Sequence, residues 1–172
     1  MAGTTTNNGW TYPTSTDLVT NGATAIQTLA TGIDTSTGKG LIAWQTYSPT
    51  LSGGWANGNG TYGYAAYAKL GKLVFFAVDF TIGSTTTKGT TLTLSLPVTA
   101  NSTATMSNLR GIASIGGTIY DLTFFGASTS TITGAAYNSA GTYTVRTGIT
   151  ATVPGTWATG DIVRVQGFYE AN

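Results

Sequence analysis

The chain has 172 residues, of which only 8% are charged, and its net charge at pH 7 is +1. This charge argues against a nucleic-acid partner, because binding a run of phosphates needs several cations on one face. The chain has neither His nor Cys, which removes Ser-His-Asp triads, Cys nucleophiles and the usual zinc, iron and copper sites. We therefore expect a protein that is not an enzyme and has no cofactor.

Composition favours one β-rich domain with a short appendage. Thr and Ser are abundant and Gly reaches 24 residues, a mixture that suits many short strands joined by tight turns. We expect no signal peptide, because no basic start leads into an apolar stretch. We also expect no membrane contact, since the longest apolar run, Leu73 to Val78, is too short to span a bilayer.

Residues 1–21 are predicted to form an extended N-terminal arm. This segment is polar apart from aromatic residues such as Trp10 and Tyr12. Free N-termini are usually disordered unless something holds them. We expect Trp10 and Tyr12 to anchor the arm in a partner protein.

Residues 22–34 are predicted to form a short helix, with Asn21 as its N-cap. Ile26, Leu29 and Ile33 recur at spacings of three and four, which places them on one narrow stripe typical of a coiled-coil seam. Isolated helices of this length are marginal in water, so we expect the stripe to form the seam of a self-associating bundle of α-helices from several copies of the chain. The alternative is that the helix lies flat against the β domain.

Residues 35–40 are predicted to be a linker, and residues 41–172 an antiparallel, jelly-roll-like β-sandwich head. The apolar run from Leu73 to Val78 predicts a central strand covered on both faces. The strands expected in the head are Leu41–Thr50, Thr61–Leu70, Leu73–Ile82, Thr90–Leu96, Thr118–Phe125, Thr131–Tyr137, Thr142–Arg146 and Ile162–Tyr169.

Two patterns in the sequence could indicate a chemical function. Residues 58–63 match G-x-G-x-x-G, but strand-forming residues follow where a dinucleotide site needs a helix, so a hairpin loop is the better interpretation. Asp79 and Asp121 both fall on predicted strands, and a glycosidase needs two carboxylates about 5–10 Å apart. The alternative is that each Asp faces outward or pairs with Lys or Arg.

Three aromatic residues lie in or beside Gly-rich loops: Trp55, Tyr62 and Trp157. Exposed aromatic rings can stack on sugars, which makes these residues candidate glycan contacts. They could instead plug one end of the sandwich or pack across a subunit interface, where Trp and Tyr are common.

Two blocks of motifs stand out within residues 10–100. The first covers the arm and helix, Trp10-Thr-Tyr-Pro13 through Asn21-Gly-Ala-Thr-Ala-Ile26. The second contains Trp44-Gln-Thr-Tyr47-Ser-Pro49, Gly58-Asn-Gly-Thr61, Gly83-Ser-Thr-Thr86 and Leu94-Ser-Leu-Pro97. The first block resembles the start of small tail-fibre or decoration-type proteins from tailed phages of actinobacteria, and the second resembles the β-rich head that follows the helix in those proteins. The resemblance implies a trimeric virion protein whose N-terminal part attaches to the particle and whose β head faces outward.

Our leading hypothesis is a non-enzymatic homotrimer on the virion surface. It would sit either at the tail, as a minor tail or fibre protein contacting host polysaccharide, or on the capsid as a decoration protein. Another class is a monomeric carbohydrate-binding module or lectin-like domain. The third is a polysaccharide-cleaving fibre that uses Asp79 and Asp121.

Overall fold

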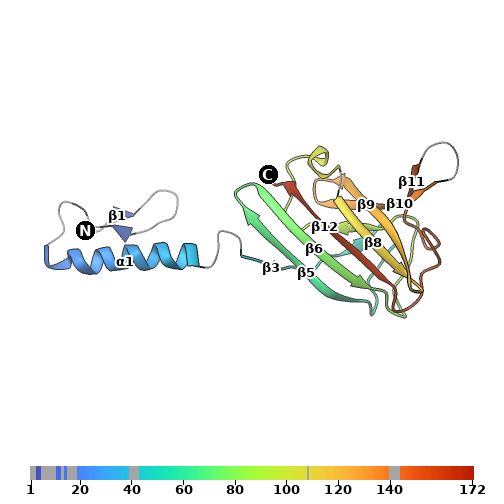
Figure 1. Ribbon diagram of the computed structural model, residues 1–172, viewed down its shortest axis with the longest axis horizontal. Helices are drawn as coiled ribbons and strands as arrows, with labels where there is room; N and C mark the ends of the chain where they lie inside the picture. The colour runs from blue at the N-terminus through green and yellow to red at the C-terminus, as the bar shows by residue number, and fades with distance from the viewer. Residues whose placement is uncertain are drawn as a thin grey trace. The chain divides into compact units, whose positions relative to one another are not determined.

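The structure is a computed structural model that describes residues 3–4, 11–12, 14, 19–38, 43–107, 109–139 and 144–172. The chain divides into two compact units, Met1–Ala43 and Trp44–Asn172. We call them the N-terminal unit and the head, and each is described by itself (Figure 1).

The N-terminal unit contains the helix α1 (Val19–Gly38) and two short antiparallel strands, β1 (Gly3–Thr4) and β2 (Thr11–Tyr12). Strand β2 packs against α1, and Figure 1 shows both strands alongside the helix. The Tyr12 ring lies over Gly3, where a Cβ atom would come within 2.7 Å of it. The described part of the arm therefore folds back on the helix, and the prediction of an extended arm is wrong for these residues.

The helix is longer than predicted at both ends. It begins two residues before Asn21, which is therefore not the N-cap, and residues 35–38 of the predicted linker belong to it. Its twenty residues include six Thr and three Gly, which together disfavour a helix by roughly 6 kcal/mol relative to alanine. Helix α1 therefore depends on packing partners.

The head contains a sheet of ten strands, antiparallel at every pairing that was assigned. Its strands are β3 (Gln45–Thr46), β4 (Leu51–Ser52), β5 (Thr61–Leu70), β6 (Leu73–Thr81), β7 (Thr93–Ser95), β8 (Leu109–Ile115), β9 (Thr118–Ser128), β10 (Thr131–Asn138), β11 (Val145–Gly148) and β12 (Ile162–Glu170). A 3₁₀ turn, Thr103–Met106, precedes β8. The strand order is β3-β5-β6-β12-β8-β9-β10-β7-β4, and β11 pairs with β10.

The sheet curls until its two edges are close. The edge strands β3 and β4 are separated by only four residues, Tyr47 to Thr50, which span at most about 18 Å. The concave side encloses one core, to which the central strands contribute alternate residues, such as Val74, Phe76, Val78 and Phe80 from β6. The predicted fold class, an all-β sandwich head with one helix before it, is confirmed.

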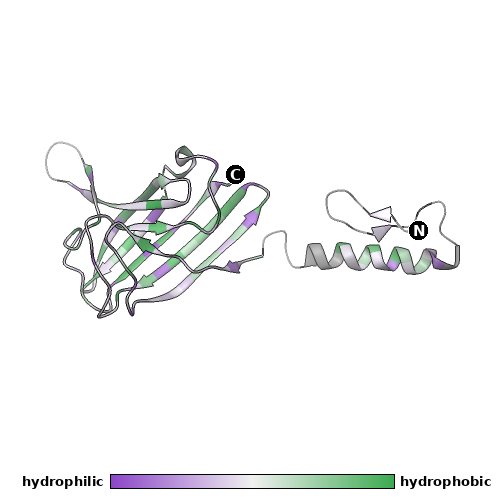
Figure 2. Ribbon diagram, turned by 180° about the vertical axis from the view of Figure 1, so that it is seen from behind, coloured by the Kyte–Doolittle hydropathy of each residue, from purple (hydrophilic) through white to green (hydrophobic). Residues whose placement is uncertain are grey.

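Only one face of the central strands is buried. The outward residues of β6 are half-buried rather than covered, and Phe168, the β12 partner of Phe75 in the register, is 61% exposed. The prediction that the run from Leu73 to Val78 is covered on both faces is therefore wrong. Figure 2 shows the hydrophobic segments along these strands.

Several strand predictions need correction. The segment Leu41–Thr50 yields only β3, with residues 41–42 outside the described part of the chain. In place of the predicted strand Thr142–Arg146, the structure has β11, which starts at Val145. Residues 142–143 lie outside the described part of the chain. Strand β8 was not predicted. Its Gly111 leaves space for the Phe124 ring, and the small residue obscures the strand pattern in the sequence.

Candidate functional site

The outward face of the head carries a groove of about 500 Å³ over strands β5, β6, β12, β8 and β9. The groove is built on one row of the sheet in which neighbouring strands contribute Cα partners: Tyr64, Asp79, Arg164, Ile112 and Asp121. Arg110 and Gln166, which are partners in the next outward row, complete its polar lining. Because strand residues alternate in direction, all these side chains share the outer face.

One ion pair crosses the groove floor. The Arg164 Nε–H donates to Asp79 Oδ2 at 2.6 Å, and half of the Arg164 side chain is exposed. Exposed pairs of this kind contribute about 0–1 kcal/mol to stability. The pair therefore mainly fixes the orientation of the two side chains.

Arg110 and Asp121 have no hydrogen bond or ion pair from their side chains to any residue that the structure describes. The groove thus holds two cations and two anions, and its formal charge is balanced. Such a lining has no preference for a strongly charged ligand. It suits a neutral ligand with many hydroxyl groups, since carboxylates accept and guanidinium groups donate hydrogen bonds.

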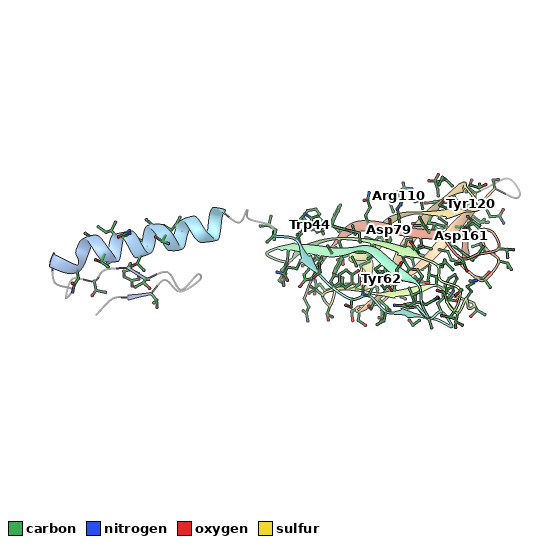
Figure 3. The ribbon with its side chains drawn as sticks, turned by 90° about the horizontal axis from the view of Figure 1, so that it is seen from below. Trp44, Tyr62, Asp79, Arg110, Tyr120 and Asp161 are labelled. Carbon is green, nitrogen blue, oxygen red and sulfur yellow. The ribbon has the colours of Figure 1, made fainter. Side chains whose placement is uncertain are left out.

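Aromatic rings stand at one side of the groove. Trp44, which is 54% exposed, contacts Tyr64 edge-on with ring centroids 6.4 Å apart. Figure 3 places Trp44, Asp79 and Arg110 on one side of the head and Tyr62 towards the other. The outer face therefore offers a ring surface next to charged hydrogen-bonding groups.

The spacing of the two carboxylates does not fit a glycosidase pair. Asp79 lies on β6 and Asp121 on β9, with β12 and β8 between them. Three strand steps separate the two backbones by about 14 Å, and Asp79 is already paired with Arg164. This agrees with the alternative that each Asp faces outward or pairs with Arg.

Two of the candidate glycan contacts are buried in the core. Trp55 and Trp157 are each 3% exposed and pack edge-to-face with centroids 5.8 Å apart. The Trp157 Nε1–H donates to the Thr150 carbonyl oxygen at 3.0 Å. The prediction that these indoles offer a stacking face is therefore wrong, and the alternative that they plug the sandwich describes them better. Gly53 and Gly54, with φ of +72° and +83°, adopt a turn conformation before Trp55 that other residues rarely reach.

Tyr62, the third candidate, is half-buried. Its ring packs on Phe80 with centroids 4.9 Å apart, and its hydroxyl donates to Asn57 Oδ1 at 3.2 Å. Burial raises the pKa of its phenol. Tyr62 therefore supports the core side of the sheet and does not belong to the groove.

The G-x-G-x-x-G segment forms a loop that leads into strand β5, but the predicted hairpin is wrong, because the preceding strand β4 pairs with β7 and not with β5. Gly58 has φ of +52° and Thr61 begins β5. Asn59 ties the loop to the next turn, because its Oδ1 accepts from the Thr85 amide at 2.8 Å and from the Thr85 hydroxyl at 2.9 Å. This arrangement lacks the helix that a dinucleotide site requires.

A second candidate surface lies on α1. Within residues 21–33, the part of the helix whose side chains the structure describes, the half-buried residues are Gly22, Ala25, Leu29 and Gly32. Of the three predicted seam residues, Leu29 belongs to this stripe, whereas Ile26 is 61% exposed and Ile33 is also exposed. Two of the three predicted seam residues, Ile26 and Ile33, are therefore exposed to solvent in the N-terminal unit of a single chain. Of the two arm anchors, Tyr12 is partly exposed and Trp10 lies outside the described residues.

Two tyrosines of the head, the buried Tyr169 and the partly buried Tyr47, have raised pKa values. Tyr169 Oη donates to the Val98 carbonyl oxygen at 2.7 Å, and desolvation by burial raises the pKa of Tyr169 to about 12. Burial, with smaller contributions from Tyr169 and Tyr62, also raises the pKa of Tyr47.

Among the described residues, no group of three or more acidic side chains is arranged to hold a metal ion. Within the same ranges, no helix has the length and apolar character needed to cross a membrane. Comparisons with family models, curated proteins and solved structures found no match to the chain. Functional inference therefore depends on the two surfaces described above.

Sequence reasoning missed most of the groove. The sequence indicates the carboxylates of Asp79 and Asp121, but no motif in it points to Arg164, Arg110, Tyr64 or Trp44 as site residues. The available signal was the alternation of side-chain direction along each strand, which places Asp79 and Arg164 on the face opposite to the apolar residues next to them in their own strands. The register that makes them neighbours joins residues 85 positions apart.

Proposed function

We propose that the chain is a non-enzymatic structural protein of a tailed-phage virion that works as a homotrimer. In this proposal the helices associate through Ile26, Leu29 and Ile33, the N-terminal unit docks to other virion proteins, and the β head is exposed on the particle. Trp10 and Tyr12 contribute to the docking, and no nucleic acid or membrane takes part.

The observation that carries the proposal is the exposure of Ile26 and Ile33 on α1. A helix rich in Thr and Gly is weak by itself, and β2 covers only part of it. Ile26 nevertheless remains 61% exposed. Burial of Ile26 and Ile33 against other copies of α1 would stabilise the helix and remove their apolar surface from water. The resemblance of residues 10–100 to phage proteins supports the virion context.

The virion assignment is tested by immunolabelling. Antibody raised against the purified chain is imaged on intact particles of the phage that encodes it. Label on the tail supports a fibre or minor tail protein, and label on the capsid supports a decoration protein. Intact particles without label, under conditions in which the antibody binds the free chain, contradict the proposal.

The groove favours a second candidate function, that of a monomeric carbohydrate-binding module. Exposed Tyr64 beside Arg110, Asp121 and the Asp79–Arg164 pair would bind a neutral glycan through ring stacking and hydrogen bonds. Binding on a glycan array by a monomer, lost in Tyr64→Ala and retained in Tyr137→Ala, would support it. Tyr137 is a matched control because it is an exposed tyrosine on β10, outside the groove.

A further inference from the structure

The outward face of the head carries an apolar patch next to the groove. We define the apolar patch by five residues: Trp44, Leu70, Leu73, Phe75 and Phe168. Their register places Phe75 opposite Phe168 and Leu70 opposite Leu73, all on the outer face. The Phe75 and Phe168 rings contact each other with centroids 6.0 Å apart.

The patch is too exposed to be an ordinary part of the core. Trp44 is 54% and Phe168 61% exposed, so these two rings alone present roughly 200 Å² of surface to water. With Leu70, which is also exposed, the patch approaches the few hundred Å² that mark interaction sites on soluble proteins. Phe168 also borders a hollow of about 360 Å³ lined by Leu109, Arg110 and Gln166. The face therefore combines projecting rings with a depression that can receive a ring.

We propose that the apolar patch is a contact surface for a second copy of this chain. The second copy would place its own patch residues against the apolar patch and the neighbouring hollow. This inference rests on the proposed self-association of the chain and adds the surface through which the heads take part. Three features favour another copy over a different partner.

The first feature is continuity along the chain. Trp44 is the first residue of the head and the sixth after Gly38, where α1 ends. Association of α1 between copies therefore raises the local concentration of the heads at their Trp44 ends, which favours a weak head contact.

The second feature is the mixed charge around the patch. Lys72 lies in the turn beside Leu73, and Glu170 is the β12 partner of Leu73; both are exposed. A copy of the same surface can offer each sign to the other, whereas a uniformly acidic or basic partner would be repelled by one of them.

The third feature is size. A stable interface buries about 800 Å² on each partner, and the patch supplies only part of this area. It is therefore suited to act together with another contact between the same molecules, and α1 provides one. We expect loss of the patch to weaken the assembly rather than to prevent folding.

The test measures the concentration at which the full chain dissociates, by sedimentation velocity over a dilution series. The variants are Phe168→Glu and the milder Phe168→Ser, with Val145→Glu as the control. Val145 is 49% exposed on β11, outside the patch. Near-ultraviolet circular dichroism of the buried Trp55–Trp157 pair verifies that each variant is folded.

We expect Phe168→Glu to raise the midpoint concentration of dissociation at least tenfold, Phe168→Ser to raise it less, and Val145→Glu to leave it unchanged. A wild-type midpoint in both Phe168 variants would overturn the head contact. So would unchanged association combined with loss of glycan binding, because the patch would then belong to a ligand site.

The helix variant Ile26→Ala separates this proposal from the trimer seam. If Ile26→Ala weakens association and the Phe168 variants do not, the head contact is wrong and the helix seam stands. If only the Phe168 variants weaken association, the head contact stands and the helix seam is wrong. A wild-type chain that stays monomeric overturns both.

Discussion

Replacing Ile26 by Ala tests how α1 contributes to self-association. Fully burying an isoleucine side chain contributes roughly 1.5–3 kcal/mol, and Ile26 has 61% of its surface available for burial between copies. Truncation to Ala, which keeps the Cβ atom, should therefore remove about 1 kcal/mol per chain. For three chains this is about 3 kcal/mol per trimer, or roughly a 150-fold change in the equilibrium constant.

Because the ratio of trimer to free chain depends on the square of the free-chain concentration, the midpoint of dissociation should rise about tenfold. Alanine is the best helix former, so weaker association could not be assigned to a weaker helix. Ile119→Ala is the matched control, since Ile119 is an isoleucine on β9 with 57% exposure.

The assay is sedimentation velocity on the full chain over a hundredfold or wider dilution series. The reasoning is refuted if Ile26→Ala and the wild type share one midpoint, or if Ile119→Ala shifts it equally. Unchanged far-ultraviolet circular dichroism would show that the helix persists in the variant.

Three further predictions concern the stability of the head, each measured by urea unfolding. Asp161→Ala should cost about 2–4 kcal/mol, because the buried carboxylate accepts from the Gly116 and Ala158 amides at 3.0 and 2.6 Å; a cost below 1 kcal/mol would contradict its bridging role. Gly111→Ala should cost about 1–3 kcal/mol, since its Cβ would collide with the Arg164 carbonyl oxygen and the Phe124 ring, and wild-type stability would show that the strands can shift freely. Stability should fall as pH rises from 10 towards 12, because the raised pKa of Tyr169, about 12, means that the unfolded chain loses this proton first. The loss is at most about 1.4 kcal/mol per pH unit for each such tyrosine, and Tyr169→Phe should reduce the slope; an unchanged slope in that variant would contradict the assignment to Tyr169.

The strands with a clear alternating pattern could be predicted from the sequence. Strand β5 has the predicted bounds, and β12 differs from its prediction by one residue. Strand β8 could not be recognised, because Gly111 and Ala113 replace large residues on its buried side to make room for neighbours such as Phe124. Its signal depends on packing from another strand, which a single segment does not contain.

The end of α1 and the burial of the loop tryptophans were mispredicted for local reasons. Residues 35–38 have the Thr, Ser and Gly composition of a linker, yet they continue the helix. A Gly-rich context made Trp55 and Trp157 resemble exposed loop residues, but the two indoles meet in the core from positions about a hundred residues apart. Intrinsic propensity does not include such contacts.

The candidate site was the least predictable part. The composition alone excluded His and Cys chemistry, and the helix pattern identified Ile26 and Ile33 before their exposure was known. The groove depends on the register of five strands. A shift of one residue in any strand would move its side chains to the other face, so the alignment of Asp79 with Arg164 needed the structure.

The solution mass of the full chain, measured by light scattering behind a sizing column, tests the central claim most directly. The account predicts a mass near three times the 17.6 kDa of one chain, decreasing on dilution. A constant mass of 17.6 kDa at every accessible concentration would contradict self-association and favour the monomeric carbohydrate-binding module.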